Sequence, residues 1–221
     1  MKNYKKNLKL LTQNHIYSDE MEHDACGVGL VASTEGKKSR MVVDYGIEAL
    51  KAVWHRGAVD ADGKTGDGAG IHLEIPKDFF IEKIQVTGHD YDNSEICVGM
   101  IFLPRNDYSS QESSKTIVES ELTKSNFSIY GWRQVPVNPK VLGEKAFQTM
   151  PEIIQVLFKS NDVNLLDKDL ERKIYETRKK IEIQADNLSL NNFYVCSMSS
   201  KSIIYKGMFL AEAISDFYLD L

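Results

Sequence analysis

Apolar and polar residues follow one another along the chain in patterns that predict a mixture of strands and helices. The run "CGVGLVAS" at 26–33 predicts a buried strand, and the polar stretch 34–40 predicts the turn after it. The next segment has helical spacing, with apolar residues three or four positions apart: Val43, Ile47, Leu50 and Trp54. Gly57 then stands where such a helix would end.

The remainder of the chain continues the mixture without an internal repeat or a low-complexity linker. Two segments have helical character, 110–125 and a long polar-faced stretch at 168–186 with Leu170, Ile174, Ile181 and Ala185 on one side. Strands are predicted at 71–75, 96–103, 127–137, 152–160, 192–200 and 202–210. The last two of these are close enough in sequence to suggest a hairpin. The sequence therefore predicts one mixed α/β or α+β domain.

Residues 1–25 form a leader whose charge is divided into two halves. Lysines come first and carboxylates follow: Lys2, Lys5, Lys6 and Lys9, then Asp19, Glu20, Glu22 and Asp24. Neither half has a sustained apolar period, so we expect an exposed and weakly ordered leader. No apolar stretch follows the lysines, which excludes a secretory signal, and the lack of arginine argues against a mitochondrial presequence.

Composition narrows the class of protein. The chain has 221 residues, 42% of them hydrophobic and 27% charged, with a net charge of −5. This mild acidity argues against a nucleic-acid partner, and no apolar run is long enough for a membrane span. The three cysteines at 26, 97 and 196 are odd in number and far apart, which favours neither a disulfide framework nor a zinc site. A reducing, cytoplasmic setting fits best.

Cys26 is the candidate nucleophile. An unperturbed thiol, with a pKa of about 8.5, is a few per cent thiolate at neutral pH and needs a base. If the chain were cut before Cys26, its new α-amine, with a pKa of roughly 7.7–8.0, could act as that base. Ala25 before it is small, and Gly27 and Gly29 after it would let a substrate approach the backbone. On these residues alone, a buried and inert cysteine in a strand is the alternative.

Other chemical motifs are weaker. The loop "DADGKTGDGAG" at 60–70 fails as an EF-hand, because its sixth and twelfth positions hold Thr65 and Ile71. Its glycines also have the wrong spacing for a dinucleotide site, so a tight turn stabilised by aspartates is the simpler interpretation. His55 could pair with Cys26, although a structural histidine at a helix end is the plainer alternative. Cys97 and Cys196 sit in apolar runs typical of a protein core.

Three stretches resemble one known family. They are "CGVGLVA", "LKAVWHRGAVDADGKTGDGAGI" and "FYVCSMSSKSIIYKGMF", and together they resemble the amino-terminal glutaminase domain of the glutamate synthase large subunit. The similarity extends to "SIYGWRQVPVNPKVLGEKA" and "FYLDL", and so covers about residue 19 to the last residue. The resemblance implies a propeptide-like leader at 1–25. It also implies that 26–221 is the front part of a class II, or type 2, glutamine amidotransferase domain.

The implied fold is α+β, the N-terminal-nucleophile hydrolase sandwich of four αββα layers with antiparallel sheets. The resemblance also implies the chemistry. After leader removal the Cys26 thiolate attacks the side-chain amide of glutamine and a thioester forms with release of ammonia. Water then frees glutamate, and the ammonia reaches 2-oxoglutarate at a distant synthase site. The loop at 60–70 has no catalytic role in this family, so Cys26 is the one catalytic residue we expect here.

Two family segments do not occur in this sequence. These are the "HQRFSTNT"-like segment that clamps the glutamine carboxylate and the "HNGE"-like oxyanion segment. We therefore expect the chain to be truncated, with a fold incomplete at its carboxyl end and very weak or no glutaminase activity alone, since losing one oxyanion donor lowers kcat by about 10²–10³.

We expect no cofactor and no metal in this segment. For the full-length enzyme the family implies FMN, an iron–sulfur cluster and an electron donor, which is NADPH, NADH or ferredoxin. The implied partners are glutamine, the remainder of the large subunit and a small subunit.

Two alternatives stay open. One is a non-catalytic remnant that keeps the fold without turnover, which the missing segments favour and the intact "ACGVG" opposes. The other is an amidotransferase of the same fold that serves asparagine, purine or amino-sugar synthesis, which the "TGDGAGI" loop opposes.

Overall fold

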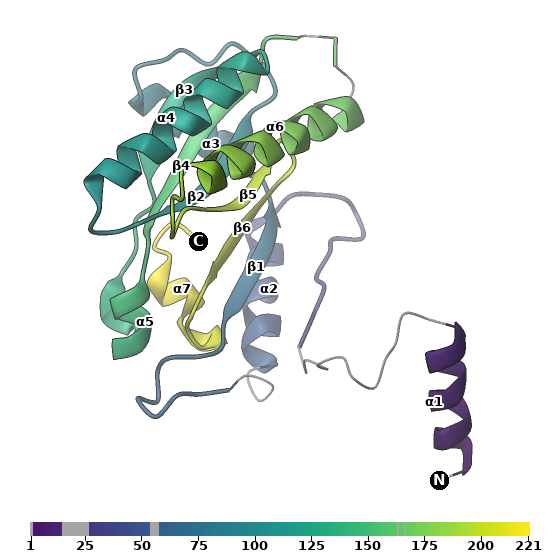
Figure 1. Ribbon diagram of the computed structural model, residues 1–221. Coiled ribbons are helices and arrows are strands. Elements are labelled where there is room, and N and C mark those ends of the chain that lie inside the picture. The colour runs from purple at the N-terminus through teal and green to yellow at the C-terminus, as the bar shows by residue number, and fades with distance from the viewer. Residues whose placement is uncertain (1, 15–26, 54–57, 163, 166) are drawn as a thin grey trace.

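A computed structural model of the chain describes residues 2–14, 27–53, 58–162, 164–165 and 167–221 (Figure 1). Cys26 and His55 lie outside these residues, so the structure does not test the roles considered for them. Over the part of the chain that is described, no helix combines the length and the apolarity needed to cross a membrane.

The larger sheet is antiparallel throughout. Within the described residues it has four strands in the order β3-β4-β2-β5. Its strands are β2 (Cys97–Leu103), β3 (Phe127–Gln134), β4 (Glu152–Ser160) and β5 (Tyr194–Ser199). The central pair, β2 and β4, is buried along most of its length, which is why both read as continuous apolar runs in the sequence.

Two helices cover one face of this sheet (Figure 1): α4 (Tyr108–Lys124) and α6 (Asp167–Asn187). The apolar side expected for the long helix is confirmed, because all four of its residues are buried: Leu170, Ile174, Ile181 and Ala185. Leu170, Ile174 and Ile181 pack in one core with residues of α4 and of β2, such as Ile117, Val118 and Ile101. Asp107 begins α4 by accepting a hydrogen bond from the Ser110 backbone N–H, as an N-cap does.

A second core lies on the other face of the large sheet. It joins that sheet to a two-stranded antiparallel sheet of β1 (Ala69–Glu74) and β6 (Ser202–Gly207), and to α2 (Arg40–Ala52) and α3 (Lys77–Val86). Gly46 of α2 allows a close approach to β1, since a Cβ there would lie 3.2 Å from Ile71 Cδ1. Short helices complete this side: η2 (Pro139–Val141), α5 (Glu144–Thr149), η3 (Ala211–Ala213) and α7 (Ile214–Phe217).

The prediction that the last two strands, at 192–200 and 202–210, pair with each other as a hairpin is wrong. A short turn does connect β5 and β6, but β5 pairs with β2 and β6 pairs with β1. Serine side chains take the place of a backbone ladder: Ser199 Oγ accepts from the Lys201 backbone N–H at 2.9 Å, and Ser197 Oγ accepts from the Ile204 N–H at 3.2 Å. The turn therefore carries the chain from one sheet to the other.

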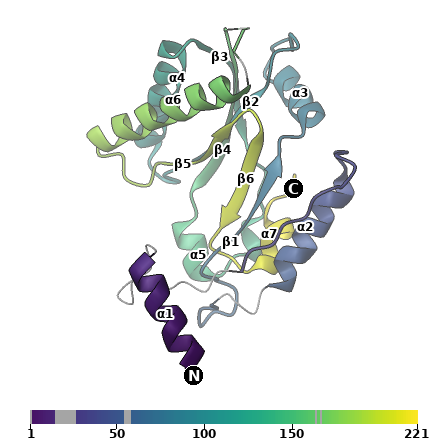
Figure 2. The ribbon, with the colours of Figure 1, turned by 90° about the vertical axis from the view of Figure 1, so that its right-hand side faces the viewer.

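Two further expectations about the first third of the chain are wrong. Residues 27–33 form no strand, and Val28 and Leu30 are 89% and 92% exposed. An apolar run becomes a strand only when another strand supplies ladder partners, and none does so among the described residues. The leader is exposed at every side chain described in it, as expected, but it is not without structure, because α1 (Lys2–Asn14) is a helix that stands apart from the sheets (Figure 2). Good helix formers and the absence of Gly and Pro favour it.

Candidate functional site

The segment that follows Cys26 runs alongside helix α2. A Cβ on Gly29 would lie 3.9 Å from Ala49 Cβ of α2, and Lys38 Nζ forms an ion pair of 2.7 Å with Glu74 Oε1 at the end of β1. The described part of the segment therefore begins beside the carboxyl-terminal half of α2 and reaches the carboxyl end of β1. Its backbone remains outside both sheets.

The other two thiols are unsuited to nucleophilic chemistry. Cys97 packs in the core under α4 and α6, and burial raises the pKa of its thiol, with the charge of Glu171 adding to the effect. Cys196 packs in the core on the opposite side of the same sheet, and burial raises its pKa to about 11. Its Sγ donates to the Ile204 carbonyl at 3.6 Å. Both thiols are core groups, as the sequence indicated, which leaves Cys26 as the candidate.

The loop at 60–70 is closed by its own aspartate. Asp62 Oδ1 accepts hydrogen bonds from the backbone N–H groups of Lys64 and Thr65 at 2.9 and 2.7 Å. Asp62 Oδ2 accepts from Thr65 Oγ1 at 2.5 Å. The bonds from Thr65, followed by that from Lys64, lower the pKa of the Asp62 carboxyl to about 2. The Asp62 carboxylate thus accepts hydrogen bonds from within its own turn. This confirms the tight-turn interpretation and gives no support to a calcium site.

The same loop is fastened to a distant part of the chain. Lys145 Nζ of α5 contacts Asp60 Oδ2 at 2.9 Å, and Asp62 also accepts from the Glu144 backbone N–H. Gly143 lies so close that a Cβ on it would overlap Asp62 Oδ2 and Thr65 Oγ1. Sequence reasoning missed this contact, because nothing local in "LGEKA" shows which loop it meets.

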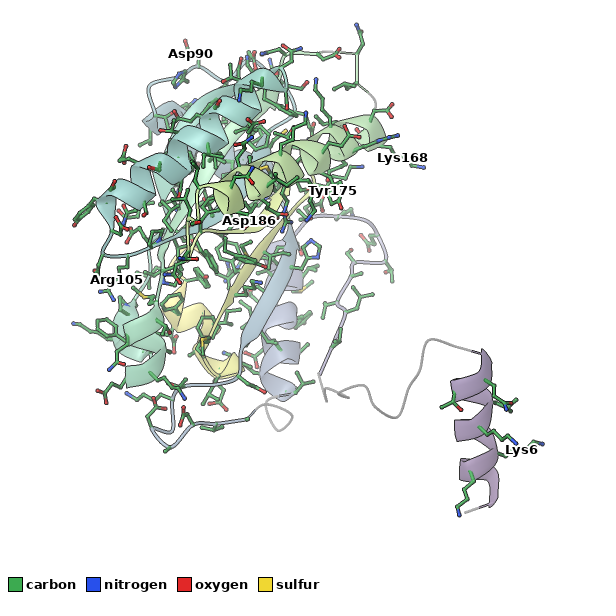
Figure 3. The ribbon with its side chains drawn as sticks, in the orientation of Figure 1. Lys6, Asp90, Arg105, Lys168, Tyr175 and Asp186 are labelled. Atoms are coloured by element: carbon green, nitrogen blue, oxygen red, sulfur yellow. The ribbon has the colours of Figure 1, made fainter. Side chains whose placement is uncertain are left out.

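Two cavities open on the described surface. One, of about 650 Å³, lies over β1 and β6, where glycines leave the backbone bare, and the Lys206 ammonium donates to Tyr194 OH at 2.7 Å at its side. The other, of about 480 Å³, has Arg105 in its lining (labelled in Figure 3). The Arg105 Cζ lies 4.6 Å from the centroid of the Phe147 ring of α5. The first includes Asp67, Gly68, Gly70, His72, Ile204 and Met208 in its lining.

The described residues contain no group of three or more His, Cys, Asp or Glu side chains that could hold a metal ion. What the structure provides is therefore a fixed loop, two inert thiols and a glycine-floored cavity at the start of β1. It does not place Cys26 among them.

Comparison with known proteins assigns the domain. The sequence pattern of the family described as "Glutamine amidotransferases class-II" matches residues 26–221. The chain is 50% identical over 218 residues to the "Glutamate synthase [NADPH] large chain" of Azospirillum brasilense, with 99% of this chain and 14% of that protein covered. It is 38% identical to the "Ferredoxin-dependent glutamate synthase" of Pyropia yezoensis, over 96% of this chain and 14% of that protein.

A third relative is the chloroplastic/mitochondrial "Ferredoxin-dependent glutamate synthase 1" of Arabidopsis thaliana, 41% identical over 90% of this chain and 12% of that protein. The chain thus spans about one seventh of the length of the first two relatives.

Proposed function

Because this chain belongs to the class II glutamine amidotransferases, we propose that residues 26–221 act in glutamine hydrolysis as part of a glutamate synthase. The observation that carries the proposal is the start of the family match at Cys26, the residue that the sequence singled out as nucleophile. The buried state and raised pKa values of Cys97 and Cys196 support this assignment, since neither can compete as a thiolate.

In the proposed reaction the leader at 1–25 is removed and Cys26 becomes the amino terminus. Its α-amine accepts the thiol proton, directly or through a water molecule. The thiolate sulfur then forms a bond to the side-chain carbonyl carbon of glutamine, and the carbon–nitrogen bond breaks as the leaving amine takes the proton and departs as ammonia. A water molecule adds to the thioester, the carbon–sulfur bond breaks, and glutamate and the free thiol result.

The fold proposed for the domain is the four-layer αββα sandwich of N-terminal-nucleophile hydrolases. Three packing observations support it: α4 and α6 cover one sheet, the second core joins that sheet to β1 and β6, and α2 packs on β1. Both sheets are antiparallel, as this fold requires.

The proposal for the whole enzyme goes beyond this chain. Ammonia from Cys26 chemistry would react with 2-oxoglutarate in the remainder of the large subunit, with a small subunit as a further partner and the cytoplasm as the location. The names of the relatives include NADPH and ferredoxin, which supports the proposal that the full enzyme uses an electron donor.

FMN and an iron–sulfur cluster would bind elsewhere. A cluster takes four cysteine thiolates, whereas Cys97 and Cys196 pack on opposite faces of one sheet and do not fit such a site. No step of the proposed hydrolysis passes through either group.

The experiment uses the full-length enzyme that carries these residues. We expect Cys26→Ser to abolish glutamine-dependent glutamate synthesis while synthesis from added ammonia continues, because only the ammonia source is lost. Cys196→Ser is the matched control and should retain both activities if the fold is intact. Glutamine should also slow alkylation of Cys26, and a thiol that glutamine does not protect would favour the non-catalytic remnant.

A further inference from the structure

The cavity of about 480 Å³ has an apolar wall whose backbone is fixed by hydrogen bonds. Segments 134–139 and 150–153 supply most of the wall, and the Val135 N–H donates to the Ile153 carbonyl at 3.0 Å, which joins the two. The apolar side chains of the lining include Val135, Val137, Met150 and Ile153. Ligand sites are commonly pre-formed in this way and have volumes of roughly 300–1,000 Å³, so this cavity has the size of a small-molecule site.

Arg105, in the loop after β2, supplies a positive group to the lining (labelled in Figure 3). Its backbone carbonyl accepts from Gln111 Nε2 at 3.2 Å, and its Nη1 makes a long contact of 3.4 Å with the Phe147 carbonyl. Within the described residues no carboxylate pairs with this guanidinium. Contact with the Phe147 ring leaves a planar fork of N–H donors, which matches the two oxygens of a carboxylate.

Glu152, the first residue of β4, supplies a negative group to the same lining. Its Oε1 accepts from Gln134 Nε2, and in the part of the chain that is described no cation pairs with it. Glu152 lies opposite Leu103 in the ladder of β2 and β4, and Arg105 follows Leu103 by two residues. The two charged residues are therefore neighbours, yet no ion pair joins them. A molecule that carries both charges would satisfy the two groups at once.

We propose that this cavity binds a free α-amino acid with an apolar side chain. Arg105 receives the carboxylate, Glu152 receives the ammonium group, and the side chain packs against Val135, Val137 and Ile153. A simple carboxylic acid or an amine has only one of the two charges. Glutamine has both, but its side-chain amide would lose hydrogen bonds to water against an apolar wall. The inference does not depend on glutamine hydrolysis, which uses no residue of this cavity.

The test is equilibrium dialysis of radiolabelled leucine against the full-length enzyme that carries these residues, without glutamine or glutamate. We expect saturable binding with a Kd of about 1 mM, because so small a ligand has little surface to bury. Arg105→Met and Glu152→Gln should each weaken binding about tenfold or more, since each removes a charge-assisted hydrogen bond. On the unchanged enzyme, methionine should displace leucine, whereas N-acetyl-leucine and leucinamide, which each lack one charge, should compete at least about tenfold less well.

The matched controls remove exposed charges outside the cavity. Arg172→Met on α6 and Glu112→Gln on α4 should bind leucine as the unchanged enzyme does. Circular dichroism reports whether each variant is folded, and the competition series needs no variant.

Two results would overturn the inference. One is the absence of saturable binding in the millimolar range, or equal binding by a folded Arg105→Met enzyme. The other is equal competition by N-acetyl-leucine, because a carboxylate alone would then suffice and Glu152 would have no role. Since dialysis needs no turnover, an enzyme without glutaminase activity leaves this test intact, and a negative result here leaves the proposed glutaminase untouched.

Discussion

Arg133 Nη2 lies 2.6 Å from Asp220 Oδ2, and only 13% and 7% of the two side chains are exposed. The guanidinium has two further contacts, since Nη1 donates to Gln155 Oε1 at 2.7 Å and Cζ lies 5.1 Å from the centroid of the Phe79 ring. Asp220 Oδ1 is buried and receives no hydrogen bond from the described residues. The pair fastens the end of the described chain to β3.

Arg133→Met should lower the free energy of unfolding by about 3–5 kcal/mol, because Asp220 would remain charged, buried and uncompensated. The double variant Arg133→Met with Asp220→Leu should lose much less, since no buried charge is left. Urea unfolding measures both. Lys37→Ala, which breaks the exposed Lys37–Glu35 pair, should change stability by about 0–1 kcal/mol. Equal losses in the single and double variants would show that packing, and not charge, is what matters.

Gly143→Ala tests the contact between the loop at 60–70 and the start of α5. The new Cβ would overlap Asp62 Oδ2 and Thr65 Oγ1, so we expect the variant to lose about 1–3 kcal/mol of stability through overpacking. Gly29→Ala is the matched control, because its new Cβ meets only an ordinary contact at 3.9 Å and the variant should be nearly neutral. Gly36→Ala would not serve as a control, because the φ of Gly36 is +65°. Truncating Asp62 to Ala in the Gly143→Ala background should recover part of the loss, as a double-mutant cycle would show.

Acid should weaken the protein through Asp62. Its pKa is about 2 in the folded chain against 3.8 as the ordinary value, so the carboxyl is held ionised by folding. A lowered pKa contributes stability that is present above pH 3.8 and is lost as the pH falls toward 2. Thermal unfolding at pH 4 and pH 2 should therefore show a larger drop in Tm for the native chain than for Asp62→Asn. Parallel curves for the two proteins would contradict the assignment.

Thiol labelling should separate the three cysteines. Burial raises the pKa of Cys196 to about 11, so on the order of one molecule in a thousand carries that thiolate at pH 8, and burial raises the pKa of Cys97 as well. We expect iodoacetamide to modify Cys26 alone in the folded protein and all three in guanidinium, as peptide mass spectrometry would show. Labelling of Cys196 at a comparable rate in the folded protein would argue against the described core.

Local patterns in the sequence determined much of what was found. The four buried positions of α6 follow from spacing alone, because one face of a helix repeats every three or four residues whatever it packs against. The continuous apolar runs of β2 and β4 likewise anticipate strands covered on both faces. The family, too, was legible from short motifs around Cys26 and the loop at 60–70.

Tertiary structure alone decided which segments meet. Spacing made 27–33 and β6 equally good strands, yet β6 found a partner in β1 while 27–33 did not. It also decided that Gly143 would meet Asp62 and that Arg133 would pair with Asp220. Periodicity reports only which side of an element is apolar, whereas a ladder, a salt bridge or a close contact depends on atoms brought together from distant parts of the chain.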